Sequence, residues 1–290
     1  MAIVTFEAQF CIMLKEPVTK SLIKSFAEQK QIFEFNSELL LHDEDPEVIH
    51  QMRLSLKRIR SIQGFVEYIS PSHPVKQKQI RKLDTVFELS GYVRDNQVQL
   101  HDLHHLQEGL QFNFTRYEKY LLKRIAESRE DFVEKVLKYE AGFLDKLYVA
   151  FIAFLYSRSE KDVQENYRSI LEENYESLMH SLQHLPDTTK GLHSLRKKVK
   201  DYINLYGLLD AEKSGRGKAT FVHFKRLDQA LGHWHDLINT QQRLKVFYKN
   251  NPVLIQKKEE YLVLWQYIED EISASREEID AILREGLHSL

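Results

Sequence analysis

Histidine, arginine and lysine recur at one spacing in two distant segments of the chain. Both segments read H-x-x-R-x-x-x-K, and their first histidines are 143 positions apart (193 − 50). Positions 0, 3 and 7 of an α-helix lie on one face, so each segment predicts a basic stripe along a helix. The stripes consist of His50, Arg53, Lys57 and Arg60 in the first segment and His193, Arg196 and Lys200 in the second.

The chemistry that such stripes favour is anion binding. Arginine holds two phosphate oxygens at once, lysine supplies a point charge, and a protonated histidine donates from both ring nitrogens. Like charges three or four positions apart destabilise an isolated helix, and an anionic ligand would relieve that repulsion. Neither stripe contains a nucleophile or a base arranged for catalysis. We therefore predict a protein that is not an enzyme and uses no catalytic residue, cofactor or metal site.

Positive charge also gathers outside the stripes. The formal net charge is only −2, but residues 50–83 contain eight Lys or Arg and one acid. Residues 190–200 and 213–227 each contain five Lys or Arg and no acid. Charge segregated in this way creates a local field even when the total is near zero. The predicted anion-binding residues therefore also include Arg58, Lys78, Arg81, Lys82, Lys197, Lys218, Lys225 and Arg226. Arg94, which lies outside these segments, is a further candidate, and the alternative for it is a local pair with Asp95 that caps the helix beginning there.

The composition favours long helices. The chain has 10 glycines and 6 prolines among 290 residues, fewer than a fold of many tight turns requires. The single cysteine, Cys11, excludes a disulfide framework. The start of the chain lacks a basic segment typical of a signal peptide, and the longest apolar run, Leu147 to Tyr156, is too short to cross a bilayer. We expect a cytoplasmic protein without a membrane partner.

Apolar residues repeat with the period of an α-helix throughout the chain, which predicts an all-α fold. Eleven helices are expected near 18–41, 47–69, 74–89, 92–109, 113–127, 129–157, 160–184, 189–210, 217–231, 234–249 and 254–286. Asp45 and Pro46 form a predicted helix start, Pro186 precedes another, and Gly215 and Gly217 indicate a loop. The predicted core stripes are Ile49, Met52, Leu56, Ile59, Phe65 and Val66, and then Leu192, Leu195, Val199, Tyr202 and Tyr206.

A second pair of motifs supports an internal repeat. A turn is predicted at Leu89–Asp95, and Leu231–Asp236 echoes it with an offset of 141 positions (236 − 95). Two motifs in the same order at nearly the same offset predict two antiparallel helical bundles related by a pseudo-two-fold axis. We assign the halves to residues 1–158 and 159–290 of one domain, 1–290. Their basic stripes are expected to face each other across a central groove.

The four motifs together resemble the CHAD family, the conserved histidine α-helical domains, over almost the whole chain. The first family motif, roughly H-x-x-R-V-x-x-R-R-L-R, is matched by His50, Arg53, Arg58 and Arg60, with Lys57 in place of an arginine. The second, roughly H-x-L-R-x-x-x-K-x-x-R-Y, is matched by His193, Leu195, Arg196 and Lys200 but has Ile203 and Asn204 at its end. The shorter motifs keep Arg94, Asp95, Val98, Leu231, Gly232 and Asp236, with Gln97 replacing an acid.

This resemblance implies two helical bundles around a basic groove that binds inorganic polyphosphate. It also implies a location on polyphosphate granules. The E-x-E-x-K signature of the triphosphate-cleaving domain that often accompanies the family does not occur here, so the chain resembles a stand-alone member. RNA presents a comparable line of phosphates and is expected to compete nonspecifically. The sequence leaves the oligomeric state open.

Two other functions remain as alternatives. His-Asp dipeptides at His42, His101 and His235 occur also in all-α metal-dependent phosphohydrolases, and His101, His104 and His105 have a spacing that could hold a metal ion. A helical scaffold without a polyanion ligand is the second alternative. The segment 214–218 superficially suggests a phosphate loop, but it lacks the G-x-x-x-x-G-K spacing and is predicted to be an interhelical loop.

Overall fold

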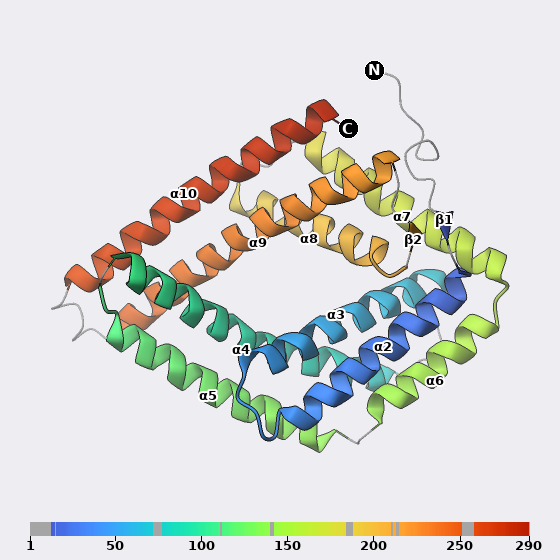
Figure 1. Ribbon diagram of the computed structural model, residues 1–290, viewed down its shortest axis with the longest axis horizontal. Coiled ribbons are helices and arrows are strands. Elements are labelled where there is room, and N and C mark those ends of the chain that lie inside the picture. The colour runs from blue at the N-terminus through green and yellow to red at the C-terminus, as the bar shows by residue number, and fades with distance from the viewer. Residues whose placement is uncertain are drawn as a thin grey trace. The chain divides into compact units, whose positions relative to one another are not determined.

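The computed structural model describes residues 13–14, 16–71, 77–110, 112–139, 142–183, 188–209, 211–212, 215–250 and 258–289. Nine helices and two short strands lie within these ranges (Figure 1). The helices are α2 (Val18–Leu39), α3 (Pro46–Ile69), α4 (Gln77–Leu110), α5 (Thr115–Lys138), α6 (Phe143–Tyr156), α7 (Glu160–Gln183), α8 (Thr189–Tyr206), α9 (Gly215–Asn250) and α10 (Lys258–Ser289). The strands β1 (Met13–Leu14) and β2 (Ala211–Glu212) pair with each other. The all-α fold class is confirmed.

Two long helices replace four of the predicted ones. The helix α4 runs through Leu89–Asp95 and α9 runs through Leu231–Asp236, so the turn and the helix break expected at these motifs were wrong. Glycine at 91 and 232 weakens a helix by about 1 kcal/mol relative to alanine but does not end it. Asp95 consequently caps no helix, since α4 begins 18 residues earlier, at Gln77.

The break between α5 and α6 was also misplaced. It was expected near residue 128, whereas α5 continues to Lys138 and α6 begins at Phe143. Gly142 precedes α6 with a φ of 90°, a left-handed conformation that glycine adopts without steric cost. The glycine therefore marks the true boundary.

Other local predictions had mixed outcomes. Asp45 caps α3 as expected, because its carboxylate accepts a hydrogen bond of 2.8 Å from the Glu47 backbone N–H and Pro46 follows it. The loop expected at Gly215 and Gly217 was wrong, since α9 already begins at Gly215. Pro186 lies outside the described residues. No described helix is both long and apolar enough to span a membrane.

The described residues divide into two compact units. The N-terminal unit holds Leu14–Leu171 and Asn204–Ala211, and the C-terminal unit holds Met1–Met13, Glu172–Ile203 and Glu212–Leu290. Within the N-terminal unit, α3 packs on α2 and α4, α4 also packs on α5, and α6 packs on α2 and α4 (Figure 1). Within the C-terminal unit, α9 and α10 pack side by side along their length.

Both apolar stripes that the sequence predicts are buried. In α3, Met52, Leu56 and Ile59 are fully buried, as are the other members of the first stripe to within 2%. The second stripe, from Leu192 to Tyr206, is buried as well. Because three-residue and four-residue steps place the basic side chains next to these stripes, the core packing fixes which way each basic stripe faces.

Candidate anion-binding surfaces

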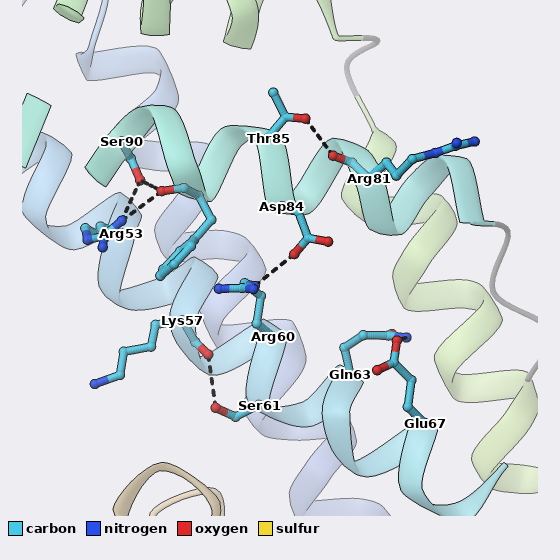
Figure 2. A network of polar contacts seen from close by, with 11 residues as sticks. Arg53, Lys57, Arg60, Ser61, Gln63, Glu67, Arg81, Asp84, Thr85 and Ser90 are labelled. Carbon is cyan, nitrogen blue, oxygen red and sulfur yellow. Dashed lines mark hydrogen bonds and ion pairs between the residues drawn. The ribbon is translucent and has the colours of Figure 1, made fainter. Parts of the chain in front are cut away.

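Arg53 is docked against α4 in the N-terminal unit. Its Nη1 atom donates to the backbone oxygen of Phe87 at 2.8 Å and lies 3.5 Å from the Ser90 hydroxyl oxygen (Figure 2). A Cβ atom at position 91 would lie only 2.8 Å from that same nitrogen. Gly91 thus leaves the space that the guanidinium occupies. The His50 motif on α3 therefore contacts the Leu89–Asp95 motif on α4.

Arg60, seven residues after Arg53 on α3 (60 − 53), also contacts α4. Its Nε atom lies 3.0 Å from a carboxylate oxygen of Asp84, and the pair is largely exposed. The guanidinium carbons of Arg53 and Arg60 both lie 4.3 Å from the centroid of the Phe87 ring. The Lys57 side chain lies between these two arginines in the sequence and extends away from the Arg60–Asp84 pair in Figure 2. The stripe therefore combines interhelical contacts with a half-buried lysine.

Alanine substitutions at the two helical glycines should distinguish the effect of side-chain packing on stability from the effect of helix propensity. Nothing lies within 4 Å of a Cβ atom built at Gly232, so Gly232→Ala should raise the free energy of unfolding by about 0.5–1 kcal/mol. Gly91→Ala has the same propensity gain but must displace the Arg53 guanidinium, so its net effect should be smaller or destabilising. Urea denaturation measures both. Equal stabilisation by the two variants would mean that the Arg53 contact contributes nothing.

His50 at the head of the first stripe lies in a cationic environment. Burial lowers its pKa, and the positive charges of Arg94 on α4 and Arg53 on α3 lower it further, against an opposing effect of Glu47. The residues predicted from two separate motifs are thus close neighbours in space. The lowered pKa favours the uncharged form of His50 near neutral pH, so the arginines are the main source of positive charge here.

The C-terminal unit repeats this arrangement with a different chemistry. The rings of His193 on α8 and His235 on α9 stack, with centroids 5.2 Å apart and planes 29° apart. His235 stands at the position that corresponds to Arg94, 141 residues earlier (235 − 94). Arg196 corresponds to Arg53, but its Nε atom is buried and finds no acceptor among the described residues. Burial lowers the pKa of His193, and His235, Arg196 and Lys197 lower it further.

The other predicted binding residues point in several directions. Arg58 donates to Gln29 of α2 at 3.3 Å, Lys82 lies 5.3 Å from the Tyr139 ring centroid, and Arg226 pairs with Glu285 of α10 at 2.6 Å. Lys225 lies 5.5 Å from the Phe221 ring centroid. Lys78, Arg81 and Lys197 are exposed, Lys200 is half-buried, and the Lys218 side chain lies outside the described residues. In Figure 2 Arg81 points away from Arg60.

The candidate metal ligands do not converge on one point. His101 and His105 bring their Nε2 atoms within 3.1 Å of each other, whereas His104 pairs with Glu118 of α5 at 2.9 Å. Among the residues that the structure describes, no three His, Cys, Asp or Glu side chains are grouped so that they could hold a metal ion. His235 Nδ1 lies 3.7 Å from a carboxylate oxygen of Asp236 and 3.1 Å from the Asn239 amide nitrogen.

The structure therefore assembles two local surfaces. His50, Arg53, Lys57, Arg60 and Arg94 lie on α3 and α4, and His193, Arg196, Lys197, Lys200 and His235 lie on α8 and α9; we call these the α3/α4 surface and the α8/α9 surface. Sequence reasoning missed Asp84 and Phe87 as partners of the arginines, although their spacing to Gly91 and Arg94 indicates one face of α4. A groove shared by both halves, and their division after residue 158, stay predictions.

The comparisons with known proteins agree with this architecture. The family model described as the CHAD domain matches residues 25–245. The crystal structure of the CHAD domain from the plant Ricinus communis is similar, with a TM-score of 0.74 and 16% identity over 97% of this chain and 95% of that one. PptA from Streptomyces chartreusis is similar with a TM-score of 0.65 and 14% identity, over 93% of this chain and 100% of that one. No curated protein matches the sequence. Because the family model spans more than half of the chain, this protein belongs to the CHAD domain family.

Proposed function

We propose that this protein binds inorganic polyphosphate without cleaving it, through the α3/α4 and α8/α9 surfaces. The observation that carries the proposal is that each unit places a histidine, an arginine and a lysine at equivalent positions along one helix. Each set is joined by a further basic residue from the next helix, Arg94 in one unit and His235 in the other. A ligand with a regular line of negative charges matches such surfaces better than a single small anion does.

The chemistry of the side chains supports binding more than catalysis. Arginine and lysine contact phosphate oxygens without needing to change protonation state, and they retain their charge at every physiological pH. In the described part of the chain, no carboxylates are grouped so that they could hold a metal ion and position a metal-activated water. Burial and neighbouring cations lower the pKa of both His50 and His193, which favours their neutral form near pH 7. In this proposal the arginines and lysines supply most of the binding energy.

Purified protein should bind long-chain polyphosphate saturably and release no orthophosphate from it. The test is a binding titration with long-chain polyphosphate, with triphosphate and RNA as competitors, beside a phosphate-release assay with Mg²⁺, Mn²⁺ or Zn²⁺ added. Competition by RNA at similar charge concentration would show that the surfaces select a line of phosphates in general. Phosphate release that disappears in Asp236→Ala or His101→Ala would instead establish a phosphohydrolase, and absence of binding would favour a scaffold.

A location on polyphosphate granules follows if the affinity is high enough. A fluorescent fusion in cells that accumulate polyphosphate should then lie on the granules. It should disperse when the arginine and lysine of either surface are replaced by alanine. A fusion that stays diffuse in granule-rich cells would contradict this part of the proposal.

A further inference from the structure

The two surfaces differ in the residue that faces the first histidine. In the N-terminal unit that residue is Arg94, whose charge is permanent, whereas in the C-terminal unit it is His235, whose charge depends on pH. Arg53 is fixed to α4 by its hydrogen bond to Phe87, but the equivalent Arg196 has a buried Nε without an acceptor among the described residues. The C-terminal unit therefore holds one buried donor, the Arg196 Nε–H, for which the described residues offer no acceptor.

We propose that His193, Arg196 and His235 form a proton-linked subsite for one phosphate group of a polyphosphate chain. The inference rests on the proposed function and assigns His235 a binding role. In the subsite, the ring pair takes up about one proton when phosphate binds, and the two imidazoles share the phosphate oxygens with the Arg196 guanidinium. Without the anion, two protonated rings with centroids 5.2 Å apart would repel each other beside Arg196 and Lys197.

Two side chains of α9 lie near the Nδ1 atom of the His235 ring. The Asn239 amide nitrogen lies 3.1 Å from His235 Nδ1, and a His235 ring with its proton on Nε2 can accept a hydrogen bond from that amide. The groups that face the pair are Arg196 and Lys197 from α8 and Asp236 and Asn239 from α9. When Nδ1 becomes protonated, Asp236, whose carboxylate lies 3.7 Å away, can accept from it after the Asn239 amide turns. Asp236 thus provides an acceptor for a proton on His235 Nδ1.

The sign of the pH effect follows from linkage. Phosphate binding favours the charged form of both rings, so the complex holds more protons than the free protein and its stability rises as the pH falls. The internal phosphate groups of a long chain keep their charge over this range. One proton taken up on binding gives about a tenfold gain in affinity per pH unit between the two pKa values of the titrating group. The α3/α4 surface, with Arg94 in place of His235, should contribute less to this dependence.

The test is a titration of the full chain with long-chain polyphosphate between about pH 5.5 and about pH 8 at constant ionic strength. Wild type should gain about tenfold or more in affinity over this range, and calorimetry in two buffers of different ionisation enthalpy should report about one proton taken up near pH 6.5. His235→Asn and His193→Asn should each reduce the gain to about threefold or less. His223→Gln, which replaces another histidine of α9 that faces Arg226 and Glu285, should keep the full gain.

The outcomes separate the subsite from the proposed function. If wild type binds but the His235→Asn and His193→Asn variants keep its pH dependence and proton uptake, the subsite is wrong and the proposed function stands. If no variant and no pH gives saturable binding, the proposed function fails and the subsite with it. Because His193 is exposed, His193→Asn should fold normally, and its circular dichroism spectrum confirms this.

Discussion

The double variant Arg196→Ala/Lys200→Ala should bind long-chain polyphosphate at least about tenfold more weakly than wild type at low salt. A well-formed hydrogen bond to a charged group contributes about 1.5–3 kcal/mol, so the loss of two such contacts exceeds the ~1.4 kcal/mol that a factor of ten requires. The helix should persist, because alanine is a strong helix former and two like charges are removed. A fluorescence titration at low ionic strength measures the change.

Lys198 offers a matched control on the same helix. Its Nζ atom donates to the Ser181 hydroxyl at 2.7 Å and to the Ser177 backbone oxygen at 3.3 Å, both on α7. Lys198→Ala therefore removes one charge from α8 without touching the α8/α9 surface, and should change affinity by less than about threefold. If Lys198→Ala and Arg196→Ala/Lys200→Ala weaken binding equally, α8 acts only through its total charge and the assigned surface is wrong.

Arg53→Ala should lower the free energy of unfolding by about 2 kcal/mol. The variant loses a charge-assisted hydrogen bond to the Phe87 carbonyl, worth about 1.5–3 kcal/mol, and a cation–π contact with the Phe87 ring, worth about 0.5–1 kcal/mol where exposed. Alanine offsets a small part of this loss through its helix propensity. Urea denaturation followed by circular dichroism gives the value.

Arg60→Ala is the comparison for that variant. It also removes a guanidinium from the Phe87 ring, but its ion pair with Asp84 is about half exposed, with 42% and 49% of the two side chains accessible. Such pairs contribute about 0–1 kcal/mol, so Arg60→Ala should cost clearly less than Arg53→Ala. Equal costs would show that the hydrogen bond from Arg53 to α4 is not what joins these helices.

The helical fold and its buried faces could be predicted because they depend on local periodicity. Every member of the stripe from Ile49 to Val66 is buried, and Asp45 and Pro46 begin α3 as their chemistry requires. Helix ends were harder to predict, because glycine has two roles. Gly142 precedes α6 with a positive φ, whereas Gly91 stays helical and leaves space for an arginine from α3. Only the tertiary contact distinguishes them.

The candidate site shows the same limit. The spacing of His50, Arg53 and Lys57 placed them on one helix face, but it did not show that Arg53 would hydrogen-bond to α4 while Arg58 turned to α2. The pairing of His193 with His235 joins residues 42 positions apart (235 − 193) and depends on how α8 packs on α9. The contacts between helices determine these roles. The residue spacing within one helix does not reveal them.

The salt dependence of polyphosphate binding tests the electrostatic account most directly. Each phosphate charge that the protein neutralises releases counterions, so the logarithm of the affinity falls with the logarithm of salt by about 0.7 per contact for a single-stranded polyanion. With about four to six contacts on the α3/α4 and α8/α9 surfaces, we expect a slope of roughly −3 to −4 between about 50 and about 300 mM salt. A slope near zero over that range would contradict binding through these basic residues.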